Sequence, residues 1–183
     1  CGPCFTRAGP LLREEGHGVT AFWYNPNVQP YKEFEARLQA FREVCGTEDI
    51  PVVVDGTYDP ERWLRGALDA ENRCDHCYRD RLGRTAEAAA EGGFDGFTTT
   101  LLASPYQDHQ LARRVGEGAA ERAGVDFLYR DFRDHWKEAR GRTFELGVYR
   151  QKYCGCIFSE RDRWLGEPEQ GTATNTPGER QKR

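Results

Sequence analysis

The sequence predicts an α/β protein with a Rossmann-like three-layer fold, a mainly parallel sheet and a C-terminal helical segment. Short runs rich in β-branched and aromatic residues alternate with helix-like segments of ten or more residues, a pattern typical of βαβ units. A length of 183 residues suits one domain with its own core. The charges are balanced, with 26 Lys and Arg against 30 Asp and Glu, and 12% of the residues are aromatic, which excludes a disordered chain.

The first half of the chain contains two predicted strands between helices. Residues 5–15 are helix-like, and the apolar run 19–24 predicts a buried strand because an Asn-Pro-Asn sequence stops it. A second short strand is expected over 50–55, before a glycine. Between the strands, apolar side chains recur along one helix face at Phe34, Leu38, Phe41 and Cys45.

The second half continues the alternation and completes one domain over residues 1–165. We expect, in order, a helix around Trp63, a helix over 74–90, a strand over 94–102, a helix over 107–123, a strand over 126–129 and a helix over 133–146. Residues 166–183 are polar without periodicity and predict a disordered tail. Parallel sheets bind ligands at the carboxyl ends of their strands, which places the expected active edge at residues 25–29, Asp55, 104–109 and Asp131.

Six of the seven cysteines form close pairs. Two of these pairs, Cys1/Cys4 and Cys74/Cys77, are CxxC motifs about 70 residues apart, and together they can bring four thiolates to one centre. Zinc and iron–sulfur clusters both accept four cysteines, so the spacing leaves the metal open, and a zinc site that only holds the fold stays possible. Cys45 lies on an apolar helix face, which favours a buried core thiol.

The third pair, Cys154-Gly155-Cys156, has a one-residue spacer that makes a poor chelate. Two thiols this close can form a small strained disulfide, which is the reducible kind, or they can remain a pair of reduced thiols. A metal centre together with a redox-capable dithiol suggests electron transfer. The alternatives are a zinc-stabilised binding module without chemistry and a thiol oxidoreductase that acts through Cys154 and Cys156.

Composition also bears on location. No apolar run approaches the roughly 20 residues that a membrane span needs, and no secretion signal opens the chain, so we expect a cytoplasmic protein with no membrane partner. The chain has no methionine and opens directly on Cys-Gly-Pro-Cys. We therefore expect that residues, including a first strand, precede residue 1. No glycine-rich nucleotide fingerprint is present.

Several long motifs resemble the QueH family of epoxyqueuosine reductases. They are RCxxCYRxRL from Arg73, FDxFTTTLLxSPY from Phe94, DFR from Asp131 and YRQKYCGC from Tyr149. The resemblance implies the reductive removal of the epoxide oxygen of epoxyqueuosine, at the wobble position of tRNAs with GUN anticodons, to give queuosine. This reaction consumes two electrons and two protons.

The resemblance also implies a [4Fe–4S] cluster and assigns its ligands. Cys1, Cys74 and Cys77 would hold the cluster, with a fourth ligand just before residue 1. The family motif reads Cys-Cys-x-Pro-Cys, and this chain matches only its last four positions. Cys4 is the candidate ligand of an adjacent mononuclear iron. Cys154 and Cys156 carry over as a redox-active disulfide.

Acids and bases near the expected active edge complete the candidates. Tyr106, Asp108, His109 and Asp131 are candidate proton donors by position. The sequence between residues 130 and 163 contains nine Lys and Arg, six acids and several aromatics. This mixture is typical of a surface that binds RNA phosphates and unstacked bases, and it is also typical of a solvated helix face. The candidate RNA contacts are Arg133, Tyr149, Arg150 and Lys152. The electron donor is not indicated by the sequence.

Overall fold

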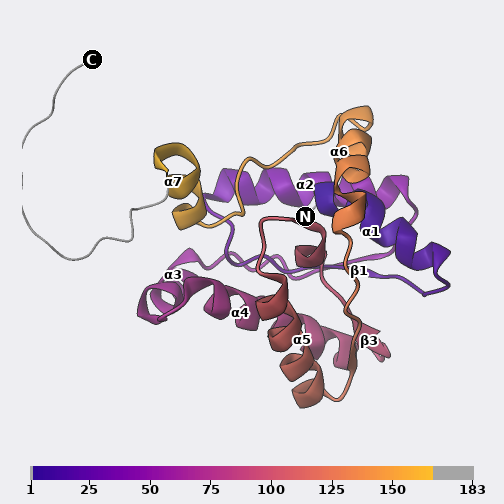
Figure 1. Ribbon diagram of the computed structural model, residues 1–183, viewed down its shortest axis with the longest axis horizontal. Coiled ribbons are helices and arrows are strands. Elements are labelled where there is room, and N and C mark those ends of the chain that lie inside the picture. Colours follow the sequence, from indigo (N-terminus) through magenta and orange to yellow (C-terminus); the bar gives the residue numbers. More distant parts are fainter. Residues whose placement is uncertain (1, 167–183) are drawn as a thin grey trace, which may run out of the picture.

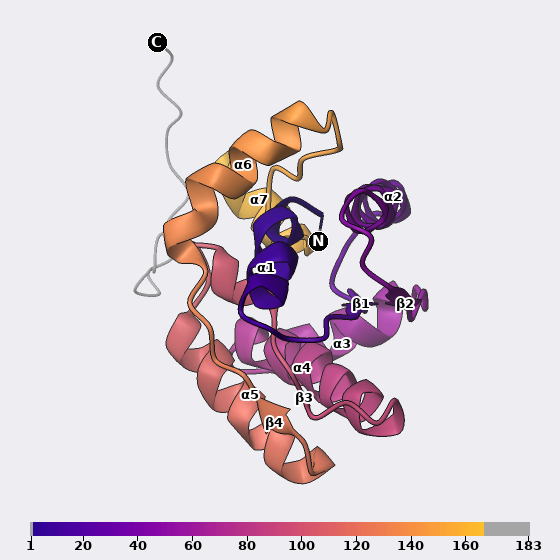
Figure 2. The same cartoon turned by 90° about the vertical axis from the view of Figure 1, so that its right-hand side faces the viewer.

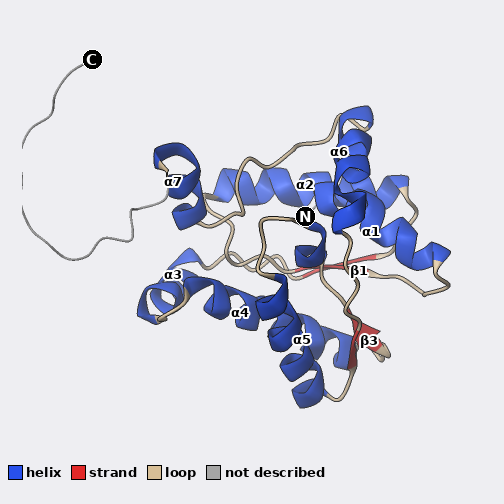
Figure 3. Cartoon of the chain, viewed as in Figure 1, coloured by secondary structure: helices blue, strands red, loops and turns tan. Residues whose placement is uncertain are grey.

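The computed structural model describes residues 2–166, and helices make up most of it (Figures 1 and 3). The helices are α1 (Gly2–Glu14), α2 (Tyr31–Thr47), α3 (Pro60–Asp69), α4 (Arg73–Glu91), α5 (His109–Ala123), α6 (Trp136–Glu145) and α7 (Ile157–Leu165), with 3-10 turns η1 (Thr100–Ala103) and η2 (Arg133–His135). The expected first strand and almost all of the expected tail lie outside the described residues. None of the described helices is long and apolar enough to cross a membrane.

The strands form two separate parallel pairs. β1 (Ala21–Trp23) pairs with β2 (Val52–Val54), and β3 (Gly96–Phe97) pairs with β4 (Asp126–Phe127). The α/β class and the parallel pairing are confirmed, whereas a continuous three-layer Rossmann-like sheet is not. A cavity of about 760 Å³ lies between the two pairs, lined by residues of β1, β3, β4 and α4. The described residues therefore build the two halves of the expected sheet without joining them.

The strand expected over 94–102 is much shorter than the sequence suggests. Only Gly96 and Phe97 pair with β4. Two residues later, the hydroxyl of Thr99 accepts a hydrogen bond from the backbone N–H of Leu101 and starts η1. Threonine favours strands but also caps helices, so here the local cap overrides the strand propensity of the Thr-rich run.

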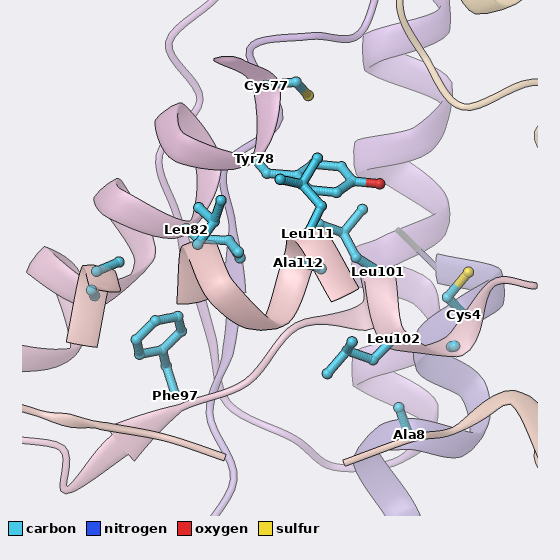
Figure 4. Packing of buried hydrophobic residues seen from close by; sticks show 14 of the residues in the cluster. Cys4, Ala8, Cys77, Tyr78, Leu82, Phe97, Leu101, Leu102, Leu111 and Ala112 are labelled. Atoms are coloured by element: carbon cyan, nitrogen blue, oxygen red, sulfur yellow. The ribbon is translucent and has the colours of Figure 1, made fainter. Parts of the chain in front are cut away.

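Two clusters of buried side chains hold the helices together. The larger one joins α1, η1, α4 and α5, and Figure 4 shows Leu82, Leu102 and Ala112 packed within it. The smaller one packs α2 on β1 through Trp23, Phe34 and Phe41. Figure 2 shows α1 between these two regions, with α2 on one side and α4 and α5 on the other. The first turn of α1, which carries Cys4, is therefore held in the interior.

The chain after α6 positions the last cysteine pair. From the end of α6, residues 146–156 run without helix or strand past α2 to reach α7 (Figure 1). Cys156 is the N-cap of α7, and its sulfur accepts the backbone N–H of Ser159. The C-terminal helical segment is thus present. The Cys154-Gly155-Cys156 sequence, just before α7, lies against the body of the domain.

Candidate active site

The second CxxC motif occupies the first turns of α4. Asn72 caps this helix, because its side-chain oxygen accepts hydrogen bonds from the backbone N–H groups of Cys74 and Asp75. A CxxC motif at a helix start places its two sulfurs on one side of the helix. Cys74 lies at the surface, whereas Cys77 is buried against the larger core cluster.

Burial raises the pKa of the Cys77 thiol to about 12. Partial desolvation raises the pKa of Cys74, and the neighbouring Cys154 raises it further. Both thiols therefore stay protonated at neutral pH in the protein alone. A bound metal would have to supply the positive charge that stabilises their thiolates.

Cys4 is buried in the first turn of α1. Burial raises the pKa of its thiol, and the nearby Cys154 acts in the same direction. Figure 4 shows Cys4 and Cys77 at two edges of the larger core cluster, with Leu101 and Tyr78 in the same region. Both cysteine motifs therefore contribute a buried thiol to the larger core cluster.

The Cys154-Gly155-Cys156 loop is held by the segment between β1 and α2. The backbone N–H of Gln29 donates to the carbonyl of Gly155 over 3.0 Å, and the Gln29 side chain accepts the N–H of Ile157 over 3.2 Å. The hydroxyl of Tyr153 donates to the Gln29 carbonyl over 2.8 Å. Segments about 125 positions apart in the sequence are therefore joined by one backbone–backbone hydrogen bond and two between a side chain and the backbone.

A buried arginine completes this attachment. Arg37 of α2, whose side chain is 2% exposed, donates to the carbonyl of Cys154 over 2.8 Å and to that of Tyr153 over 3.1 Å. Its Nε pairs with Glu33 over 2.7 Å. Gly155 packs against the same group at a φ of +144°, and a Cβ there would lie 2.9 Å from Asn27 and 3.1 Å from Arg37. Only glycine fits both this backbone angle and this space.

Cys154 lies near the second CxxC motif, since its sulfur is 3.8 Å from the Gln107 side chain and Gln107 accepts a hydrogen bond from Tyr78, the residue after Cys77. The Cys154 thiol raises the pKa of Cys4, Cys74 and Cys77, after the larger effect of burial on each. The described cysteines are all free thiols. The Cys154–Cys156 disulfide therefore stays a prediction, and so does the role of Cys1, which lies outside the described residues.

The donor chemistry fits a thiolate-ligated centre. Within residues 2–166, no group of three or more His, Cys, Asp or Glu side chains is arranged closely enough to hold a metal ion. The side chains of Cys4, Cys74 and Cys77 are nevertheless thiols, which are ligands of both zinc and iron–sulfur clusters. The residues therefore fit such a centre by the type of donor that they supply.

The candidate proton donors lie around the start of α5. Tyr106 is 80% exposed and stacks edge-on against Trp136. Asp108 caps α5 by accepting the N–H of Leu111. His109 is buried, with Nε2 3.0 Å from the Ser104 carbonyl.

Asp131 differs from these candidates in its protonation state. Hydrogen bonds from Arg133 lower the pKa of Asp131 to about 2. Its carboxylate is therefore ionised at neutral pH and has no proton to give, which argues against a donor role. Asp131 instead lies 4.0 Å from Nδ1 of His109 and forms an ion pair with Arg133.

The candidate RNA contacts divide into two groups. Arg150 stacks on the exposed ring of Phe144, 3.4 Å from its centre, and Lys152 lies over the exposed ring of Trp164. These two cations are presented at the surface beside aromatic rings. Arg133, in contrast, is bound to Asp131, and the Tyr149 hydroxyl donates to Glu33.

Sequence reasoning missed Arg37. A signal was present, because Arg37 lies three residues after Phe34 and four before Phe41, on the apolar face of α2. The side chain of a charged residue on such a face either turns away from the core or is paired with a buried partner. Gln29 and Gln107 fell only within ranges assigned to the active edge, without a role of their own.

Comparison with known proteins identifies the family of the chain. Residues 1–162 match the family model described as "Epoxyqueuosine reductase QueH". A relative of that name from Dehalococcoides mccartyi is 35% identical over 92% of this chain and 92% of its own length. Relatives of the same name from Thermotoga maritima (37% identical, 78% of this chain, 79% of its own) and Histophilus somni (32%, 88% and 70%) also match. The chain therefore belongs to the epoxyqueuosine reductase QueH family and is an oxidoreductase.

Proposed function

We propose that this chain reduces epoxyqueuosine to queuosine at the wobble position of tRNA, with a [4Fe–4S] cluster as its cofactor. Family membership supports the reaction. The observation that supports the cofactor is that Cys77 and Cys4, one from each CxxC motif, are buried free thiols, and that the Cys154 sulfur lies 3.8 Å from Gln107, which is hydrogen-bonded to Tyr78 beside Cys77. A zinc-stabilised binding module would require no such redox-capable neighbour.

Cys74 and Cys77 would hold the cluster together with Cys1 and the residue before it. Cys4 would serve an adjacent iron. When bound, the cluster supplies electrons one at a time. The helix start at Asn72 and the buried first turn of α1 present these thiols from two rigid elements, which is the usual way to hold a metal site in place.

The dithiol of Cys154 and Cys156 matches the electron count of the reaction. Converting the epoxide to an alkene breaks two C–O bonds and releases the oxygen as water, which consumes two electrons and two protons. Oxidation of two thiols to one disulfide yields two electrons and two protons. Tyr106 and His109 are near neighbours in sequence of Gln107, whose side chain lies 3.8 Å from the Cys154 sulfur, and they are the further candidates for proton transfer. The electron donor that restores the dithiol is not indicated.

The direct test uses protein with the preceding residues restored, purified without oxygen. We expect iron and acid-labile sulfide in the protein, and one-turnover conversion of epoxyqueuosine-containing tRNA after chemical reduction. One equivalent of zinc without iron would instead establish the binding module. Thiol–disulfide exchange without conversion of the tRNA would establish the thiol oxidoreductase.

The role of the dithiol has its own prediction. We expect Cys154→Ser to retain its iron but to lose most of its steady-state turnover, because serine cannot form a disulfide. Ser159→Ala is the matched control, since Ser159 contacts the same loop but carries no redox chemistry. Repeated turnover of Cys154→Ser at the wild-type rate would remove the disulfide from the mechanism.

The tRNA would be bound through cations beside exposed rings. Arg150 over Phe144 and Lys152 over Trp164 form such a surface, on the segment that carries the dithiol. Backbone phosphates attract the cations, and unstacked bases can stack on the rings. A tRNA substrate and a set of reduced thiols both suit a cytoplasmic, reducing compartment.

Removing both cations is expected to weaken tRNA binding in a salt-dependent way. For Arg150→Ala/Lys152→Ala, the slope of log K against log salt should fall in magnitude by roughly 0.7–0.9 for each lost phosphate contact. Binding titrations at several salt concentrations measure this slope. The control, Arg42→Ala/Arg122→Ala, removes the same charge from exposed positions elsewhere. An equal change in both double variants would show that only net charge matters.

A further inference from the structure

The half-buried side chain of Gln107 connects the CxxC helix to the dithiol loop. Its Oε1 accepts a hydrogen bond from the hydroxyl of Tyr78 over 2.8 Å. Its Nε2 and Oε1 both lie 3.8 Å from the sulfur of Cys154. Tyr78 directly follows Cys77 and is buried in the core, so one end of this chain of contacts is rigid.

We propose that Gln107 is a positioning residue that stabilises the reduced form of the Cys154–Cys156 pair, and that the Tyr78 hydroxyl orients it. This inference rests on the proposed function of that pair.

The chemistry of the amide explains the direction of the effect. A thiol can donate its S–H to Oε1, and a thiolate can accept from Nε2. A disulfide sulfur has no proton to donate and carries no negative charge, so it gains less from the same amide. The contact therefore favours the two thiols over the disulfide that they form when two electrons and two protons leave.

Tyr78 decides which way the amide faces. An amide that could turn freely would present either end to the sulfur. Because the Tyr78 hydroxyl donates to Oε1, the oxygen and the NH₂ group cannot exchange places, and both stay 3.8 Å from the Cys154 sulfur, Oε1 as acceptor for the thiol and Nε2 as donor for the thiolate. Loss of this hydroxyl should weaken the effect of Gln107 without removing it.

The fraction of Cys154 and Cys156 that forms a disulfide can be measured on a single tryptic peptide. Trypsin cuts after Lys152 and Arg161, and the peptide 153–161 contains Cys154 and Cys156 but no other cysteine. The full chain, as purified without oxygen, is equilibrated in buffers of reduced and oxidised glutathione. It is then quenched in acid, alkylated and digested, and mass spectrometry gives the fraction of disulfide.

We expect Gln107→Leu to shift this equilibrium about fivefold toward the disulfide, the size of one net hydrogen bond. That shift equals about 20 mV, since a tenfold change is about 30 mV for a two-electron couple. Tyr78→Phe should shift it in the same direction by less. The double variant should match Gln107→Leu alone, because Tyr78 acts only through the amide.

The control is Gln110→Leu, an exposed glutamine on the first turn of α5, which should leave the equilibrium unchanged. Thermal unfolding of each variant separates a change in redox equilibrium from a loss of fold. A shift under twofold for folded Gln107→Leu, an equal shift for Gln110→Leu, or additive effects of the Tyr78 and Gln107 variants would overturn the inference. The measurement needs no tRNA, so its failure is distinct from a failure to convert epoxyqueuosine.

Discussion

Cys77→Ala is expected to lose its iron and sulfide and to lower reductase activity by more than about 100-fold. Mutating even an outer-shell partner of a metal ligand typically costs about 10–100-fold in metal affinity or activity, so removal of a ligand should cost more. Cys77 is buried near the start of α4, so the helix and the core around it fix the position of its sulfur. Iron and sulfide analysis of the purified variant measures the loss directly.

Cys45→Ala is the matched control for this experiment. Cys45 is fully buried in the smaller core cluster, packed with the side chains of α2 and β1. Burial raises the pKa of its thiol to about 11, and no other cysteine acts on it. We expect this variant to keep its iron and to lose about 1–2 kcal/mol of the free energy of unfolding. Iron retained in Cys77→Ala, or lost equally in both variants, would contradict the assignment.

Arg37→Met is expected to lower the free energy of unfolding by about 3–5 kcal/mol, because it leaves one partner of a buried ion pair without the other. Arg37 and Glu33 are 2% and 12% exposed. The substitution also removes both side-chain donors from the carbonyls of Tyr153 and Cys154. The dithiol loop should then react faster with an alkylating reagent in the folded protein.

Two further variants test the cause of this loss. Glu33→Gln combined with Arg37→Met should recover part of the stability, since a neutral amide costs less to bury than a carboxylate. Arg42→Met, at an exposed position of the same helix, should change stability by less than about 0.5 kcal/mol. A loss below about 1 kcal/mol for Arg37→Met, measured by denaturant unfolding, would show that the buried pair contributes little.

Much of the local structure was predictable from residue patterns. The predicted strands at 19–24, 50–55 and 126–129 each contain the observed strand, the helices α4 and α5 lie near their predicted bounds, and α2 contains the predicted apolar face. The apolar spacing and the capping residues Asn72 and Asp108 act within a few residues, so a sequence reports them directly. The long strand at 94–102 was wrong, because the cap at Thr99 competes with strand pairing.

The candidate site was predictable only in its parts. The cysteine pairs and the basic, aromatic C-terminal segment are visible as motifs. That Cys154 lies near the CxxC helix through Gln107, and that Arg37 is bound to its carbonyl, depends on contacts between residues that are 47 and 117 positions apart. No local pattern encodes such contacts.

The sequence by itself determined which groups are available: six cysteines in three close pairs, the helix starts that present them, and a family of reductases. The tertiary structure alone decided which groups meet. Residues 146–156 run past α2, and a buried arginine and a backbone hydrogen bond to Gln29 hold Cys154 and Cys156 there. The physical reason is that a buried charge and a buried peptide carbonyl each require a partner, and only packing supplies one.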